Sequence, residues 1–320
     1  MPAIVTVLGE IDPATLGPTD CHEHLLIRGG LPIVLEPDFR LDSVDAAVAE
    51  VGDFQAAGGA ALVDCMPLGV GRDARGLAEV AERTGATVVA TTGFHRDLYY
   101  AADHWVRTYD AERIADLMVA EHTEGMEVSG YGGPFVERIA ARPGAIKLAF
   151  SGPEPTPTER KLAAAVGMAQ RRTGLPVVTH TDDERSAALQ LSILDGYGVP
   201  PSSVVFGHMD RHTGVAGLAE VCRTGATVCL DWLGRHDRRP DSYVADLAAG
   251  LAAEGCLDGV VLGQDLARRG YWRAYGGGPG LANLVATFPA LLRKAGLTDD
   301  HIRQLLVDNP RRVLTRLEPS

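Results

Sequence analysis

The amino-acid sequence predicts a single α/β domain, residues 1–320, folded as a (β/α)8 barrel of the TIM type. Short β-branched, apolar runs that follow Gly or Pro alternate with helical segments rich in Ala, Leu, Glu and Arg. Eight such units imply an all-parallel sheet, and eight units close naturally into a barrel. No linker or low-complexity tract divides the chain. A doubly wound open sheet is the alternative, but CHEHLLIRGG after the first strand lacks the GxGxxG fingerprint usual there.

The predicted strands are runs of four to six residues that are mostly apolar and frequently β-branched. In chain order they are Thr19–His22, Ala60–Cys65, Thr87–Thr92, Ala145–Phe150, Pro176–His180, Ser203–His208, Thr227–Asp231 and Gly259–Gln264.

The predicted helices are amphipathic segments that follow these strands. They are Leu41–Ala57, Arg75–Thr84, Ala111–Glu124, Glu159–Thr173, Glu184–Tyr197, Gly214–Arg223, Asp241–Glu254 and Leu281–Ala295. A closing helix outside the eight units is expected over Thr298–Arg316, with a break at Pro310.

Composition narrows the class of protein. The chain is 46% hydrophobic and 22% charged, which is ample for one large core. Its five cysteines show no paired or CxxC spacing, and MPAIVTVLGE has no basic segment before an apolar core, so we expect a cytoplasmic protein without disulfides. No run of 18 apolar residues occurs, and the net charge of −12 disfavours nucleic acid and anionic membranes as partners.

Polar side chains collect at the ends of the predicted strands. His22 and His24 are two residues apart, so in an extended strand they share a face and form a compact chelate for a first-row metal. His180 and His208 end the fifth and sixth strands, and Asp265 follows the eighth. One histidine at a strand end usually only satisfies a hydrogen bond. Four histidines and an aspartate at the mouth where parallel strands end predict a metal site.

Lys147 lies in the otherwise apolar run Gly144–Phe150. Lysine is almost never buried without a partner, although a solvated lysine at the strand end is the simpler interpretation. The functional alternative is a desolvated amine of lowered pKa, which reacts with carbon dioxide to give a carbamate. That reaction converts a cation into a carboxylate able to bridge two metal ions.

Together these motifs resemble the phosphotriesterase family of the amidohydrolase superfamily. The resemblance rests on the HxH of the first strand, on Lys147, and on THTD, GHMD and GQD at three later strand ends. It extends to YGGGPG at residues 275–280 and to NPRR at residues 309–312, so it covers nearly the whole chain.

The resemblance implies a site for two divalent metal ions. His22, His24 and Asp265 would hold the buried ion, and His180 and His208 the more exposed one. N6-carboxylated Lys147 and a hydroxide would bridge them. Zinc is favoured by the histidines, although manganese or cobalt suits the same ligands.

Hydrolysis follows from such a site. Two metal ions roughly 3.5–4 Å apart share a hydroxide and lower its pKa. The hydroxide attacks a polarised carbonyl or phosphoryl group, and Asp265 carries the proton to the leaving group, so Asp265 is the predicted catalytic residue.

The arginines of two loops indicate what kind of substrate the protein binds. Residues 233–239 carry Arg235, Arg238 and Arg239, and residues 265–273 carry Arg268, Arg269 and Arg273, which predicts recognition of an anionic group unless these are ordinary surface arginines.

In these loops the chain resembles the branch of the family that hydrolyses phosphorylated sugar lactones. The Arg and Tyr that hold the phosphate in that branch match Arg268 and Tyr271, and the segment GFHRD, with Phe94 and His95, also resembles it. The sequence departs from this branch where a loop-seven lysine is expected, so Arg235 or Arg238 would replace it. It also has Trp232 where simple lactonases have Arg.

We therefore expect a lactonase that acts, as a homodimer, on a small anionic substrate. The enzymatic alternative is hydrolysis of a neutral phosphotriester, an aryl ester or an N-acyl amide, with Trp232 and Phe94 lining an apolar pocket. The non-enzymatic alternative is a catalytically idle, metal-dependent binding protein.

Overall fold

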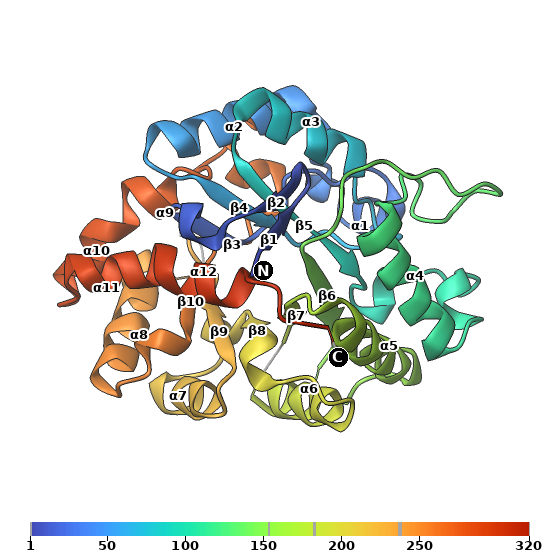
Figure 1. Ribbon diagram of the computed structural model, residues 1–320. Helices are drawn as coiled ribbons and strands as arrows, with labels where there is room; N and C mark the ends of the chain where they lie inside the picture. Colours follow the sequence, from blue (N-terminus) through green and yellow to red (C-terminus); the bar gives the residue numbers. More distant parts are fainter. Residues whose placement is uncertain (1, 153, 182–183, 236–238, 320) are drawn as a thin grey trace.

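Eight parallel strands form the centre of the molecule. The computed structural model describes residues 2–152, 154–181, 184–235 and 239–319. The strands lie in one sheet in chain order, and helices cover its outside (Figure 1). They are β3 (Thr19–Glu23), β4 (Ala61–Asp64), β5 (Thr87–Gly93), β6 (Ala145–Ala149), β7 (Val177–His180), β8 (Val204–Gly207), β9 (Thr227–Leu230) and β10 (Val260–Leu262). Each coincides with a predicted strand, shifted by at most two residues at an end.

The sheet closes into a barrel between β10 and β3. The backbone N–H groups of Gln264 and Asp265, just past β10, both donate to the carbonyl of His22 in β3, at 3.3 and 2.8 Å. Asp265 has a left-handed backbone with φ 51°, which turns the chain sharply at that point. The predicted barrel is therefore confirmed, and the open sheet is excluded. Closure also fixes Asp265 beside β3.

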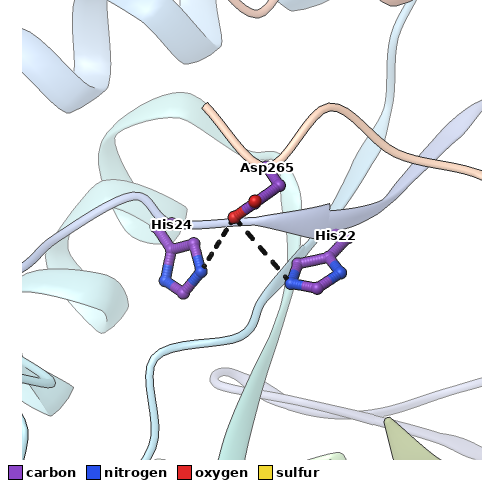
Figure 2. A group of neighbouring side chains, drawn as sticks. All are labelled: His22, His24 and Asp265. Atoms are coloured by element: carbon purple, nitrogen blue, oxygen red, sulfur yellow. Dashed lines mark ion pairs between the residues drawn. The ribbon is translucent and has the colours of Figure 1, made fainter. Parts of the chain in front are cut away.

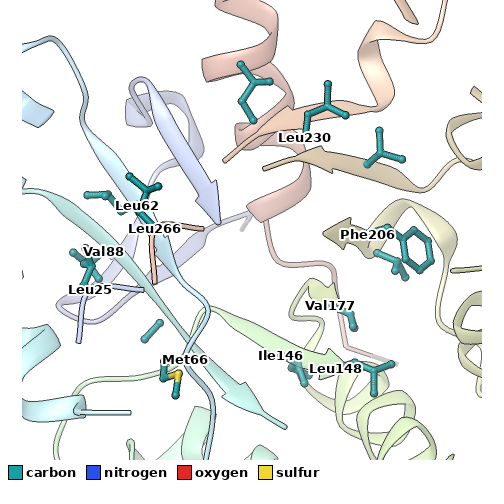
Figure 3. Packing of buried hydrophobic residues seen from close by; sticks show 14 of the residues in the cluster. Leu25, Leu62, Met66, Val88, Ile146, Leu148, Val177, Phe206, Leu230 and Leu266 are labelled. Carbon is teal, nitrogen blue, oxygen red and sulfur yellow. The ribbon is translucent and has the colours of Figure 1, made fainter. Parts of the chain in front are cut away.

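Two apolar layers hold the barrel. A small buried cluster draws residues from all eight strands, which is the pattern of a filled barrel interior; examples are Cys21, Val63, Val178 and Val261. The larger cluster contains alternate residues of seven of these strands, β4 to β10, and residues of the helices that face them. Figure 3 shows part of that cluster, with labelled residues from six of the strands, β4 to β9.

Helices alternate with the strands. They are α2 (Val44–Ala56), α3 (Ala74–Thr84), α4 (Ala111–Glu124), α5 (Pro157–Thr173), α6 (Glu184–Gly196), α7 (Val215–Arg223), α8 (Asp241–Ala253), α9 (Asn283–Ala286) and α10 (Phe288–Lys294). Their ends carry local signals. In α5, Thr156 directly before the helix and Glu159 in its first turn form a capping box around Pro157, and Gly174 ends the helix with φ 71°.

The eighth predicted helix was wrong as a single segment. It is divided into α9 and α10 at Thr287, and Pro289, which has no N–H to continue the hydrogen-bond ladder, lies in the first turn of α10. The predicted closing segment is likewise divided, into α11 (Asp299–Arg303), a π-helical turn (Gln304–Asp308) and α12 (Asn309–Leu314), which contains Pro310.

Two features were not predicted from the sequence. The hairpin of β1 (Ile4–Thr6) and β2 (Gly9–Ile11) lies at the end of the barrel where both termini are found (Figure 1). Its Ile4 packs with the interior cluster, and Val7 donates its backbone N–H to Val88 of β5 at 3.0 Å. At the opposite mouth, the segment after β3 forms the short helix α1 (Gly30–Leu35).

Among the described residues, no helix is both long enough and apolar enough to cross a bilayer.

Candidate functional site

His22, His24 and Asp265 come together at one mouth of the barrel. Both histidines come from the end of β3, and Asp265 reaches them from the turn after β10 (Figure 2). The Oδ1 of Asp265 lies 3.3 Å from His24 Nε2 and 4.0 Å from His22 Nε2. One possible ligand atom from each of the three residues lies within 4.8 Å of the other two, a separation that one metal ion can span.

The other three predicted ligand positions border the same pocket. Lys147, on β6, is 1% exposed, and its Nζ lies 3.2 Å from His22 Nε2. The ring of His208 is 4.7 Å from that of His22 and 4.4 Å from that of His180, measured between ring centres. The barrel therefore gathers all six positions, although they come from five separate places in the chain.

Asp231 orients two of these histidines. It follows β9, and its carboxylate lies 2.9 Å from His22 Nδ1 and 2.8 Å from His208 Nδ1. Its Oδ2 also accepts the backbone N–H of His208 at 2.9 Å. These contacts place the proton of each ring on Nδ1 and leave the Nε2 lone pair free for a ligand. Asp231 ends the predicted strand Thr227–Asp231, but no role was expected for it from the sequence. The available signal was a charged residue directly after an apolar strand.

Burial keeps three of the histidines, His22, His180 and His208, in their neutral form. Burial, together with the charge of Lys147, lowers the pKa of His22 to about 4. Burial and the charge of Arg211 lower the pKa of His208 to about 3. Burial and the neighbouring His208 hold the pKa of His180 well below its usual range. Neutral imidazole is the form that binds metals.

The carboxyl group of Asp265 stays ionised although it is buried. Burial alone would raise the pKa of Asp265, but Arg235 and the hydrogen bond from His24 outweigh it and leave the pKa well below its usual range. Ionised oxygens beside neutral imidazoles are a donor set that suits a divalent first-row ion. The buried Nδ1 of His24 has no hydrogen-bond partner among the described residues. The residues present therefore fit the metal ions that the sequence predicts.

A second group with ligand spacing, His22, Cys229 and Asp231, fits a metal poorly. Burial raises the pKa of the Cys229 thiol well above its usual value, so the thiol keeps its proton. The Asp231 carboxylate is already bonded to His22 and His208. We interpret this group as one that holds the histidine rings in position, with no metal of its own.

Two arginines hold Asp265 from its other side. Arg211 Nη2 lies 3.0 Å from Asp265 Oδ2, and Arg235 forms an ion pair with the same oxygen. Arg211 Nη2 is also 2.9 Å from His208 Nδ1. That nitrogen donates its proton to Asp231, so the contact with Arg211 is electrostatic. Arg211 was not predicted from the sequence to belong to the site; it ends a short 3-10 helix (Met209–Arg211), three residues after His208.

The predicted substrate residues divide into two groups. His95, Arg235, Arg268 and Tyr271 line the pocket. Phe94 does not, because its side chain is 1% exposed and packs against Tyr100 and Trp105 in the core.

Trp232 is also absent from the described lining of the pocket. The centre of its ring lies 5.5 Å from the Cζ of Arg211 and 5.8 Å from that of Arg239. The expectation that Phe94 and Trp232 line an apolar pocket is therefore corrected. Both support neighbouring residues instead.

The remaining arginines of the two basic loops lie outside this lining. Arg269 stacks on Tyr275 with its Cζ 4.1 Å from the ring centre, and Arg273 donates to the carbonyl of Pro279 at 2.7 Å. Arg238 falls outside the described residues.

Comparison with known proteins agrees with this geometry. The model of the phosphotriesterase family matches residues 2–314. A phospho-furanose lactonase of Mycoplasmopsis agalactiae is 32% identical over 323 residues, which cover 98% of this chain and 92% of the relative. The crystal structure of an amidohydrolase from Mycoplasma synoviae superposes with a TM-score of 0.96 at 32% identity and covers 100% of this chain and 93% of its own. A phosphotriesterase homology protein from Escherichia coli, solved with phosphate in its active site, has a TM-score of 0.85 at 29% identity and covers 95% and 100%.

Proposed function

This chain belongs to the phosphotriesterase family, and from that premise we propose that it is a metal-dependent hydrolase that opens a lactone bearing an anionic group. One observation carries the proposal. A single pocket has histidines, Asp265 and Lys147 at its floor and the guanidinium groups of Arg235 and Arg268 toward its mouth. The floor suits metal-assisted hydrolysis, and the mouth suits an anion.

The floor would hold two divalent ions. His22, His24 and Asp265 would bind one, His180 and His208 the other, and Lys147 would join them as a carbamate. Bound there, the ions would supply Lewis-acid polarisation of the substrate and a lowered pKa for water.

Asp265 would move the proton of the reaction. Opening a lactone forms a bond between a water oxygen and the carbonyl carbon, breaks the bond from that carbon to the ring oxygen, and transfers a proton to the ring oxygen. Asp265 is ionised, as a proton acceptor must be, and Arg211 and Arg235 hold its carboxylate in place. The ring of His95, which also lines the pocket, would contact the substrate.

The anionic group would lie against Arg268 and Tyr271, with Arg235 between them and the floor. The Cζ of Arg235 lies 5.8 Å from the centre of the Tyr271 ring, so these groups are neighbours. Two relatives support this part of the proposal. One is named a phospho-furanose lactonase, and the other was solved with phosphate in its active site.

The alternatives are less well supported. A site for neutral esters or amides built on Phe94 and Trp232 is not favoured, because neither residue lines the pocket. A catalytically idle binding protein is disfavoured because four histidines and an ionised Asp265, all side chains able to bind metal, border one pocket.

A substrate panel tests the proposal. The protein is loaded with zinc, manganese or cobalt in the presence of bicarbonate and assayed with phosphorylated and unphosphorylated sugar lactones, aryl esters, phosphotriesters and N-acyl amides. We expect kcat/KM to be highest for a phosphorylated lactone. A preference for neutral esters or amides, or no hydrolysis in protein carrying its metal, would contradict it.

A further inference from the structure

Arg268, at the mouth of the pocket, is paired with a carboxylate of the same chain. Its Nη2 forms an ion pair with Glu36 Oε2, and its Cζ lies 4.3 Å from the centre of the Phe39 ring. Glu36 lies between α1 and a 3-10 helix (Pro37–Phe39), and all three side chains line the pocket. The group that we propose to hold the substrate's anion therefore already has an anionic partner.

This pair is more exposed than the ion pair between Arg235 and Asp265, which lies deeper in the pocket. The side chains of Glu36 and Arg268 are 41% and 33% exposed, whereas those of Asp265 and Arg235 are 12% and 13% exposed. Water and salt screen exposed pairs strongly, so they contribute little stability. An incoming anion would therefore displace Glu36 from Arg268 far more easily than it would displace Asp265 from Arg235.

The backbone around Glu36 is well anchored. Gly30, at the start of α1, has φ 76°, and a Cβ there would lie 2.8 Å from the backbone of Val70. The N–H of Glu36 donates to the carbonyl of Pro32 at 2.9 Å. Rotation of the Glu36 side chain toward solvent is thus enough to free Arg268, and no movement of the segment is needed.

We propose that Glu36 is a specificity-determining residue that occupies the anion position until a dianionic group displaces it. The inference rests on the proposed function, in which Arg268 and Tyr271 hold an anionic substrate. A phosphate monoester carries nearly two charges and three acceptor oxygens, so it bonds Arg268 more strongly than a single carboxylate does. A carboxylate-bearing substrate gains little by exchange with Glu36. A neutral substrate meets a mouth whose charge is already balanced.

The test is a double-mutant cycle on the metal-loaded protein with inorganic phosphate as the probe. Binding is measured by calorimetry for the wild type, Glu36→Gln, Arg268→Gln and the double variant. Removing the competing carboxylate should tighten phosphate binding about twofold to fivefold, the scale of one exposed ion pair. The gain should vanish in the Arg268→Gln background, because the carboxylate acts only through that guanidinium.

Glu254→Gln is the matched control. Glu254 is 48% exposed and pairs with Arg223, at 2.6 Å, outside the lining of the pocket. This variant makes the same change in net charge and should leave phosphate binding unchanged. An equal gain in Glu254→Gln would overturn the inference, because it would then reflect net charge alone.

The remaining outcomes separate this inference from the proposed function. If Arg268→Gln weakens phosphate binding but Glu36→Gln leaves it unchanged or weaker, Glu36 merely supports Arg268, and only the inference fails. If Arg268→Gln has no effect on phosphate binding, the proposed anion position is wrong and the inference fails with it.

Discussion

Asp265 is the residue at which the charges of the pocket meet. One carboxylate oxygen faces His24, and the other faces Arg211 and Arg235. A carboxylate held by two guanidinium groups is ionised and fixed in direction, so it is ready to accept a proton in the proposed reaction.

Replacing Asp265 with Asn should therefore preserve the fold and lower kcat by about two orders of magnitude or more, the contribution of one acid–base group. Stopped assays of a phosphorylated lactone measure the loss, and the metal content of the variant is determined alongside because Asp265 is also a proposed ligand. Near-normal turnover in a fully loaded Asp265→Asn variant would remove this residue from the mechanism.

Lys147 is the residue proposed to join the two metal ions. It is buried, and its Nζ lies 3.2 Å from His22 Nε2. If its carbamate joins the two ions, Lys147→Ala should lose metal and activity together, and short carboxylic acids should restore part of both. Elemental analysis and assays with added acetate measure this. A Lys147→Ala variant with two ions per chain would contradict the carbamate role.

Arg268 separates charged from neutral substrates. One charge-assisted hydrogen bond is worth about 1.5–3 kcal/mol, so Arg268→Ala should lower kcat/KM for a phosphorylated lactone roughly tenfold to a hundredfold. The unphosphorylated lactone should be nearly unaffected, and the difference should shrink at high salt because the group is partly exposed. Equal losses on both substrates would mean that Arg268 supports its loop.

The sequence predicted which residues converge at this end of the barrel better than it predicted which loop residues line the pocket. All of the proposed ligands except Lys147 lie at or just after the ends of strands, and parallel strands end at one mouth, so their convergence is predictable. Phe94 and Trp232 lie in loops, where spacing does not decide whether a side chain turns into the pocket or the core. Arg211 and Glu36 were missed because the barrel brings them to Asp265 and Arg268 from distant parts of the chain.

At the scale of elements, helix α2 holds the loop that follows β10, although the two are far apart in the sequence. Glu50, in α2, is 1% exposed, and its carboxylate accepts the backbone N–H groups of Ala274 and Leu281 at 2.7 and 3.2 Å. Trp272 is fully buried and donates its indole N–H to the carbonyl of Leu266 at 2.7 Å. These contacts set the position of Arg268 and Tyr271.

Glu50→Ala should destabilise the protein and loosen this loop. Each buried N–H left without a partner costs about 1–3 kcal/mol, and KM for the phosphorylated lactone should rise because the loop carries the proposed anion position. Urea unfolding and steady-state kinetics measure the two effects. Glu50→Gln keeps one acceptor oxygen, so its effects should be smaller. Unchanged unfolding and KM in Glu50→Ala would show that the loop holds its conformation without this carboxylate.

The regular elements were the most predictable part of the fold. Strand and helix periods, with glycine and proline at their boundaries, located all eight barrel strands. They also located seven of the eight helices that were predicted to follow those strands. The β1–β2 hairpin was missed because its strands have three residues each, too short to show a period. The segment with α1 was missed because tertiary contacts, such as that of Gly30 with Val70, decide its conformation.

At the scale of the whole molecule, the proposed ligands join distant parts of the barrel. They come from β3, β6, β7, the end of β8 and the turn after β10, so the unfolded chain contains no such site. Metal binding would therefore stabilise the folded state by RT ln(1 + [L]/Kd) for each ion.

Removing the metal should consequently lower the melting temperature. At a free metal concentration a thousand times Kd, each ion contributes about 4 kcal/mol, so chelation should cause a fall of several degrees, and added zinc should reverse it. Calorimetric scans of loaded, chelated and reloaded protein measure the effect, with Lys147→Ala as the control that should respond less. The melting temperature should keep rising with free metal after the site is filled, because the unfolded chain binds none. An identical melting temperature with and without metal would mean that the histidine cluster is stable by itself, held by Asp231 and by the barrel.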